Sequence, residues 1–145
     1  MHLVRFVVAA VIASGTACTN ATGTSVNDVA TRRAEWQARG IASYTYEFRI
    51  TGFFIACAAG PVRVHVHGGV VDAATLIATG QPPNAPMSCW PTIDQLFGYA
   101  IAAGQNGALA DVQFDATIDY PTEIDVSGPP DASGSYFASS LVPDR

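Results

Sequence analysis

Apolar and polar side chains alternate over two segments in the first half of the chain, with a period that predicts strands. Tyr44, Tyr46, Phe48 and Ile50 alternate with polar residues between about Ala42 and Thr51, so we expect a half-buried strand there. Valines alternate in the same way over 62–67. Gly68-Gly69 then predicts a hairpin turn, with the partner strand running from Val70 to about Thr79.

Two other segments carry apolar side chains at helical spacing. The first follows a cap at Ser25 or Asn27 and runs to about Arg39. The second runs from Ile93 to about Ala103, after a capping box that begins at Thr92. Two helices are therefore predicted.

Three more strands are predicted after the second helix, over Leu109 to about Thr117, Glu123 to Val126, and Tyr136 to Leu141. The proline-rich segment from Gln81 to Met87 predicts an exposed loop. Because the links between strands are short, antiparallel meanders are favoured over parallel crossovers. We expect an α+β fold in the order helix, three strands, helix, three strands, with both helices packed on one face of an antiparallel sheet.

The N-terminus has the pattern of an export signal. Arg5 precedes an apolar run from Phe6 to Ala13, and small residues follow up to Ala17. The run is shorter than the roughly 18 residues that a membrane-spanning helix needs. Residues 1–17 are therefore predicted to be a cleavable signal peptide. Gly15-Thr16-Ala17-Cys18 is similar to a bacterial lipoprotein cleavage box, which predicts lipid attachment at Cys18.

The rest of the chain is long enough for one folded domain and too short for two. Residues 18–25 are polar and predict a flexible tether, and residues 26–145 predict a single α+β domain. The formal net charge is −5, from 12 acidic residues against 7 basic ones. Because the arginines form no patch and lysine is absent, nucleic acid and anionic membrane surfaces are not expected partners.

Three cysteines in an exported chain leave one over when two of them pair. We predict a disulfide between Cys57 and Cys89, since exported proteins mature in an oxidising compartment. The thiol of Cys18 would then carry the lipid. The alternative is a protein that is secreted or periplasmic and soluble, with a free thiol on Cys18.

An ordered series of short motifs extends from about Ala34 to Leu141. It comprises Trp36, Ile41, Tyr44 and Tyr46, then Gly60-Pro61-Val62-Arg63-Val64 with Gly69-Val70-Val71, Pro91-Thr92-Ile93-Asp94-Gln95-Leu96-Phe97, Val112 with Phe114 and Asp115, and Tyr120-Pro121-Thr122. This series resembles DUF6174, a family of small bacterial envelope proteins of unknown function. The resemblance implies an exported, often lipid-anchored bacterial protein. It implies no catalytic or cofactor-binding residue.

Two groups of side chains are candidates for metal binding. His65 and His67 share a strand face, about 6 to 7 Å apart by strand rise, but a site needs further ligands and Arg63 lies on the same face. The C-terminal third is acidic, with no calcium-loop pattern. Its acidic residues are Asp111, Asp115, Asp119, Glu123, Asp125 and Asp131. We expect solvated faces and no metal site in either place.

No catalytic motif is found. Cys89 beside Ser88, with His65 or His67 elsewhere, supplies the side chains of a nucleophile and a base, but neither a nucleophile elbow nor a Cys-x-x-Cys pair is present. We therefore predict no enzyme activity and no cofactor.

Most of the aromatic side chains are assigned to the core, because they lie on the apolar faces of the predicted elements. These are Trp36, Tyr44, Tyr46, Phe48, Phe97, Phe114 and Tyr136. Phe53-Phe54-Ile55 and Trp90 lie in or beside predicted loops, where they either turn inward or form an exposed apolar patch for a partner.

The sequence thus predicts a lipid-anchored envelope protein whose domain binds or supports another envelope component without catalysis. The partner is an unknown envelope protein or a small ligand. The alternative is a domain that binds a small ligand or a cation, through the acidic C-terminal face or through the strand that carries His65 and His67.

Overall fold

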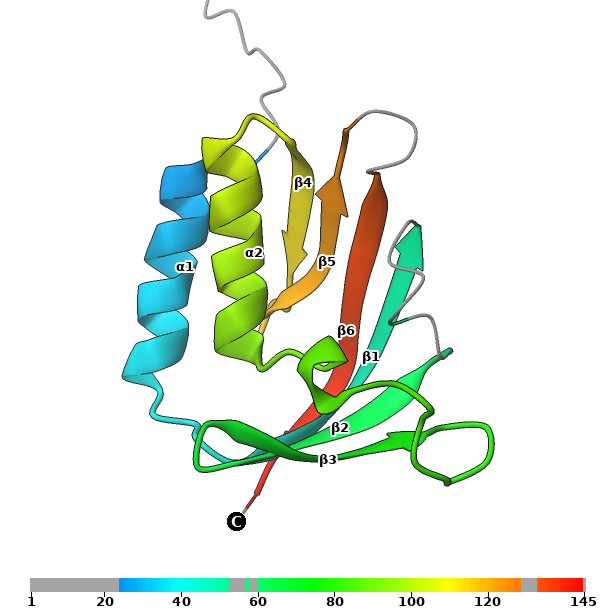
Figure 1. Ribbon diagram of the computed structural model, residues 1–145. Coiled ribbons are helices and arrows are strands. Elements are labelled where there is room, and N and C mark those ends of the chain that lie inside the picture. Colours follow the sequence, from blue (N-terminus) through cyan, green and yellow to red (C-terminus); the bar gives the residue numbers. More distant parts are fainter. Residues whose placement is uncertain (1–23, 53–56, 58–59, 129–132, 145) are drawn as a thin grey trace, which may run out of the picture.

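The computed structural model describes residues 24–52, 57, 60–128 and 133–144 (Figure 1). The predicted signal peptide, Cys18 and most of the predicted tether lie outside these residues. The described elements, in chain order, are helix α1 (Val26–Ala38), strands β1 (Tyr44–Gly52), β2 (Val62–His67) and β3 (Val70–Leu76), the 3-10 turn η2 (Met87–Cys89), helix α2 (Ile93–Gln105), and strands β4 (Leu109–Phe114), β5 (Pro121–Val126) and β6 (Gly134–Pro143).

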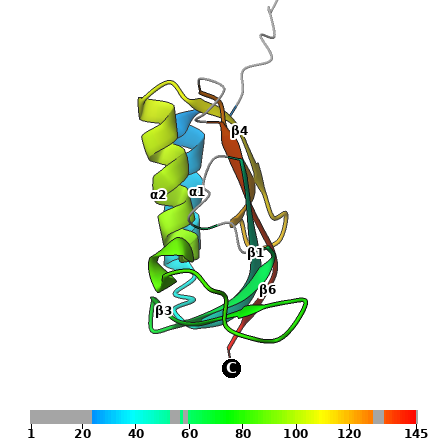
Figure 2. The same ribbon diagram turned by 45° about the vertical axis from the view of Figure 1, so that its right-hand side comes forward.

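All six strands form one antiparallel sheet, in the spatial order β3-β2-β1-β6-β5-β4. Each half of the chain contributes a three-stranded meander, and the pairing of β1 with β6 joins the two. Both helices lie on the same side of this sheet (Figures 1 and 2). The predicted α+β fold is confirmed, and its predicted order lacked one element, the 3-10 turn η2.

Local side-chain hydrogen bonds fix where both helices begin. Ser25 caps α1 and Thr92 caps α2, each in a reciprocal capping box with the residue three positions on. The start of α2 is also held by the sheet, because the hydroxyl of Tyr44 accepts a hydrogen bond from the backbone N–H of Ile93 at 2.8 Å. The hydroxyl of Tyr46 donates to the carbonyl of Pro91. Burial raises the pKa of Tyr44 to about 12, so this hydroxyl stays neutral.

Several strand ends differ from the prediction because turns interrupt them. Strand β4 ends at Phe114, and the carboxylate of Asp115 accepts the backbone N–H groups of Thr117 and Ile118 at 2.8 and 2.9 Å, which forms a tight turn. Strand β3 ends at Leu76, whose N–H bonds to the carbonyl of Gln81. Strand β5 begins earlier than predicted, and strand β6 extends beyond the prediction at both ends.

The core lies between the helices and the sheet face beneath them. Tyr46, Phe48 and Phe97 are among its fully buried side chains, and all seven aromatic residues assigned to the core from the sequence contribute to it or pack against it. Trp90 was left open between an inward and an exposed position, and the structure buries it beside Phe48, at a ring distance of 6.4 Å. The other residues of that possible patch, 53–55, lie outside the described residues.

Two connections tie peripheral segments to this core. The sulfur atoms of Cys57 and Cys89 lie at disulfide distance, 2.11 Å apart, which links the segment before β2 to the turn η2. At the N-terminal end, the hydroxyl of Thr24 lies 3.0 Å from both the carboxylate of Asp111 and the carbonyl of Val112. Thr24 and Ser25, which were assigned to the tether, are therefore bonded to the domain.

Candidate functional site

The side of the sheet opposite the helices is the main candidate site. Within the described part of the chain, neither helix lies over it, as the turned view makes plain (Figure 2). We call this side the uncovered face. Its central side chains are Glu47 and Arg49 of β1, Glu123 of β5, and Phe137 and Ser139 of β6. They point away from the core because they alternate with buried residues along each strand.

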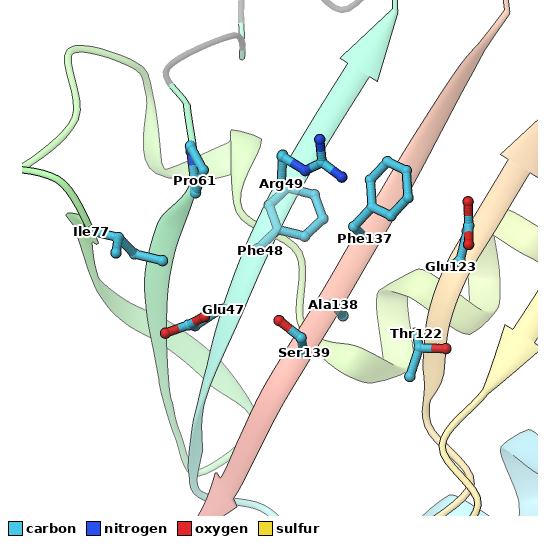
Figure 3. A pocket seen from close by; sticks show the side chains of 10 residues that line it. All are labelled: Glu47, Phe48, Arg49, Pro61, Ile77, Thr122, Glu123, Phe137, Ala138 and Ser139. Atoms are coloured by element: carbon cyan, nitrogen blue, oxygen red, sulfur yellow. The ribbon is translucent and has the colours of Figure 1, made fainter.

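A hollow of about 370 Å³ lies at the centre of the uncovered face (Figure 3). Pro61 and Ile77 form one side of it, and Thr122 and Glu123 form the other. The exposed fraction of Ile77 is 40%, which is high for a large apolar residue. The hollow therefore combines apolar surface with charged groups, as binding surfaces commonly do.

Strand register places three chemically different side chains in one row across the hollow. Phe137 of β6 is the cross-strand partner of Arg49 on one side and of Glu123 on the other. The guanidinium carbon of Arg49 lies 4.1 Å from the centre of the Phe137 ring, which is a cation–π contact. A cation, an aromatic ring and an anion thus follow one another over β1, β6 and β5. We call this the central row.

Arg49 differs from the other arginines of the described residues in its partners. Arg32 and Arg39 both pair with Asp119, Arg33 pairs with Asp94, and Arg63 pairs with Glu47, at distances from 2.6 to 3.2 Å. Within the described residues Arg49 makes no such ion pair. A guanidinium that stacks on a ring keeps its N–H edge available for hydrogen bonds. Arg49 is therefore the arginine best placed to meet a group from outside the domain.

The predicted pair His65 and His67 also lies on the sheet, with ring centres 6.4 Å apart. Both ring nitrogens of His65 face carboxylates: Nδ1 lies 2.5 Å from Asp72 and Nε2 lies 3.2 Å from Asp144. The hydrogen bond with Asp72 raises the pKa of His65. Burial opposes this rise, and the hydrogen bond with Asp144 adds to it. The geometry fits a protonated imidazole, which can donate from both nitrogens.

Across the described residues, no group of three or more His, Cys, Asp or Glu side chains is placed to hold a metal ion. The acidic residues of the C-terminal third are instead distributed among separate contacts. Asp111 bonds Thr24, Asp115 forms its own turn, Asp119 pairs with two arginines, Asp125 accepts the hydroxyl of Ser135 at 2.6 Å, and Glu123 lies in the central row. Asp131 lies outside the described residues.

The cysteine and serine considered as nucleophiles lie on the helix side of the molecule, in or beside η2. Cys89 is 8% exposed and lies at disulfide distance from Cys57. His65 belongs to β2, where it bonds Asp72 and Asp144. Ser88 and Cys89 thus belong to η2, whereas both histidines belong to β2.

The central row was not singled out from the sequence. The alternation over 44–51 does place Arg49 on the outward side of its strand. Its neighbours, however, come from β6 and from the register of that strand against β5. The only local signal was the pair Tyr136-Phe137: consecutive residues of a strand point to opposite faces, so an inward-facing Tyr136 implies an outward-facing Phe137.

The geometry defines a small α+β domain with a six-stranded antiparallel sheet covered by two helices on one side. Residues 28–141 match the model of a family of unknown function, DUF6174. Since this match covers most of the chain, the protein belongs to that family. The comparisons found no similar curated protein and no similar solved structure. Neither helix of the described residues is long and apolar enough to cross a membrane.

Proposed function

We propose that this protein is a bacterial envelope lipoprotein whose domain binds a partner through the uncovered face and carries out no catalysis. The observation that supports the proposal is the hollow on that face, where Arg49 lies on Phe137 without a carboxylate partner among the described residues. Arginine and aromatic residues are enriched among the side chains that dominate binding energy at protein interfaces.

The polar surroundings of the hollow support binding to another protein better than insertion into lipid. Glu47, Glu123 and Ser139 line the hollow together with Phe137, and Glu47 is paired with Arg63. A mixed polar rim around an aromatic anchor is the ordinary composition of a protein interface. A surface that enters a bilayer would instead be apolar or basic.

The anchor is the second part of the proposal. A signal peptide over 1–17 would place Cys18 at the new N-terminus, only a few residues before Thr24, where the described domain begins. A pair of cysteines at disulfide distance suits a protein that matures outside the cytoplasm. A short tether to the membrane would keep the domain near other envelope proteins.

The anchor is tested by the intact mass of the full chain extracted from bacterial membranes. The expected mass is that of residues 18–145 with a diacyl or triacyl group, and C18S is expected to leave the membrane fraction. A full-length or unacylated mass in the membrane fraction would contradict the anchor.

The binding face is tested by photo-crosslinking in intact bacteria. A photoreactive residue at position 139 lies on the uncovered face, and one at the exposed position 35 of α1 is the matched control on the helix side. We expect discrete crosslinked products from position 139 and none from position 35. Absence of any product from position 139 would contradict the proposed role of this face.

A further inference from the structure

We propose that the partner on the uncovered face is a second copy of this chain, packed sheet against sheet. This inference rests on the proposed function, because it names the partner of the same face. It is argued from the order of charges in the central row, from the positions of the two N-terminal ends, and from the size of the face.

The central row is complementary to itself. Neighbouring strands lie about 4.8 Å apart, so Arg49 and Glu123 flank Phe137 at nearly equal distances on either side. A two-fold axis that runs along β6, in the plane between two facing sheets, exchanges the positions of β1 and β5. Arg49 of each copy then faces Glu123 of the other, and the two Phe137 rings meet near the axis. Two oppositely charged pairs form from one sequence.

The next row of the uncovered face is compatible with the same axis. Thr51 of β1 and Asp125 of β5 are both register partners of Ser135 on β6. The axis therefore places the hydroxyl of Thr51 opposite the carboxylate of Asp125 in the second copy, as a hydrogen-bond donor facing an acceptor. Glu47, the other acidic residue near the axis, is already paired with Arg63 at 3.2 Å. No two like charges of these rows face each other.

The same axis keeps both N-terminal ends on one side of the pair. Thr24 lies at the edge strand β4, where it bonds Asp111 and Val112, at the end of the sheet where α1 begins (Figure 1). Rotation about an axis along the strands leaves this end pointing in the same direction in both copies. Two tethers can then reach one membrane. Anchoring two copies in one membrane also raises their effective concentration.

The face is large enough for a stable pair. Six strands at a spacing of about 4.8 Å span about 24 Å, and strands of six to ten residues extend for about 20 to 33 Å. The face therefore offers roughly 500 to 800 Å² per copy, close to the roughly 800 Å² per partner of a standard interface. Aligned packing of two sheets is a common arrangement in β-sandwiches.

The test is a charge exchange at the central row in the full chain, purified from membranes in a nonionic detergent. The variants are R49E, E123R and the double variant R49E/E123R, which has the same net charge as the original chain. E35R on the exposed side of α1 is the control, since it makes the same charge change as E123R away from the face. Sedimentation velocity gives the oligomeric state, and far-ultraviolet circular dichroism checks the fold.

We expect a dimer for the original chain and for E35R, at least a tenfold weaker dimer for each single variant, and recovery in the double variant. A dimer that the single variants leave unchanged would overturn the proposed axis. A monomer whose position 139 crosslinks to a different protein would overturn the inference and leave the proposed function intact. A monomer with no crosslinked product at position 139 would overturn both.

Discussion

The two faces of the sheet are built from the same strands and have opposite properties. On β1, Tyr46 and Phe48 are 0% and 1% exposed beneath the helices, whereas Glu47 and Arg49 point to the uncovered face. One side is filled by aromatic and aliphatic contacts with α2. The other mixes apolar and charged groups, and in its central row a cation, a ring and an anion lie side by side.

Within β1, the side chains of the covered face contribute mainly to stability, and those of the uncovered face are available for recognition. Side chains on the covered face lose both their burial and their packing when they are truncated. Side chains on the uncovered face can change with little effect on folding, because water already reaches them. Substitutions on the two faces should therefore give effects of very different size, and the following experiments rank them.

The largest effect is expected from truncation of Phe48 on the covered face. F48A should lower the free energy of unfolding by about 3 to 5 kcal/mol, because it leaves a cavity among buried aromatic rings. F137A on the uncovered face is the matched comparison and should cost much less. Urea denaturation followed by tryptophan fluorescence measures both. Equal losses would show that the two faces do not differ as described.

The next effect is expected from the cysteine pair, which ties η2 and Trp90 to the covered side. C57S/C89S removes a link between positions 32 residues apart, and should lower the free energy of unfolding by about 2 to 4 kcal/mol. The double variant avoids leaving one cysteine unpaired. Urea denaturation of the oxidised original chain, with and without reductant, provides the comparison. No change on reduction would contradict a bridge between these residues.

A smaller, pH-dependent effect is expected at His65, which joins β2 to β3 and to the C-terminal residues. Since the pKa of His65 is raised above 6.5, the folded state binds its proton more tightly than the unfolded chain does. The stabilisation is complete below pH 6.5 and is lost as the pH rises through the raised pKa. The groups are well exposed, so we expect less than about 1 kcal/mol.

Nuclear magnetic resonance titration of the His65 ring measures this pKa directly. D72N and D72N/D144N should move the titration midpoint down in two steps, because each removes a carboxylate that holds the proton. A midpoint of 6.5 or lower in the original chain would contradict the stabilising contacts of His65 with Asp72 and Asp144. On the same face Arg63, two residues before His65 on β2, is paired with Glu47.

A similarly small effect on folding is expected at Arg49. R49Q removes an exposed cation–π contact and should lower the free energy of unfolding by only about 0.5 to 1 kcal/mol. The same change should weaken self-association, since the guanidinium is proposed to meet Glu123 of a second copy. Thermal unfolding and sedimentation velocity on one sample separate the two quantities. A large loss of stability would place Arg49 with the core instead.

Features decided by neighbouring residues could be predicted from the sequence. Ser25 and Thr92 cap their helices through groups three positions away, and the hairpin at Gly68-Gly69 depends on adjacent positive-φ glycines. The end of β4 was placed too late, because apolar periodicity does not show that Asp115 binds the backbone of Thr117. The turn η2 was missed because the prolines before it indicate only irregular structure.

Three features that depend on distant residues could not be predicted. Trp90 is buried because it follows the bridged Cys89 and packs against Phe48, a position that its local sequence does not determine. His65 contacts Asp144 only because the C-terminal end of β6 lies beside the start of β1, which pairs with β2. The central row likewise depends on the pairing of β6 with both β1 and β5, so its three residues carry no common signal along the chain.

The pairing of β1 with β6 has a consequence for how the chain acquires its fold. The centre of the sheet joins an early strand to the last one, so that Gly52 meets Gly134 and Tyr44 meets Pro143. Loops of this length close slowly, and contacts between distant residues delay folding. During synthesis the β1-β2-β3 meander and the β4–β5 hairpin have no strand between them until β6 emerges. A chain that stops before Gly134 lacks the strand that joins them.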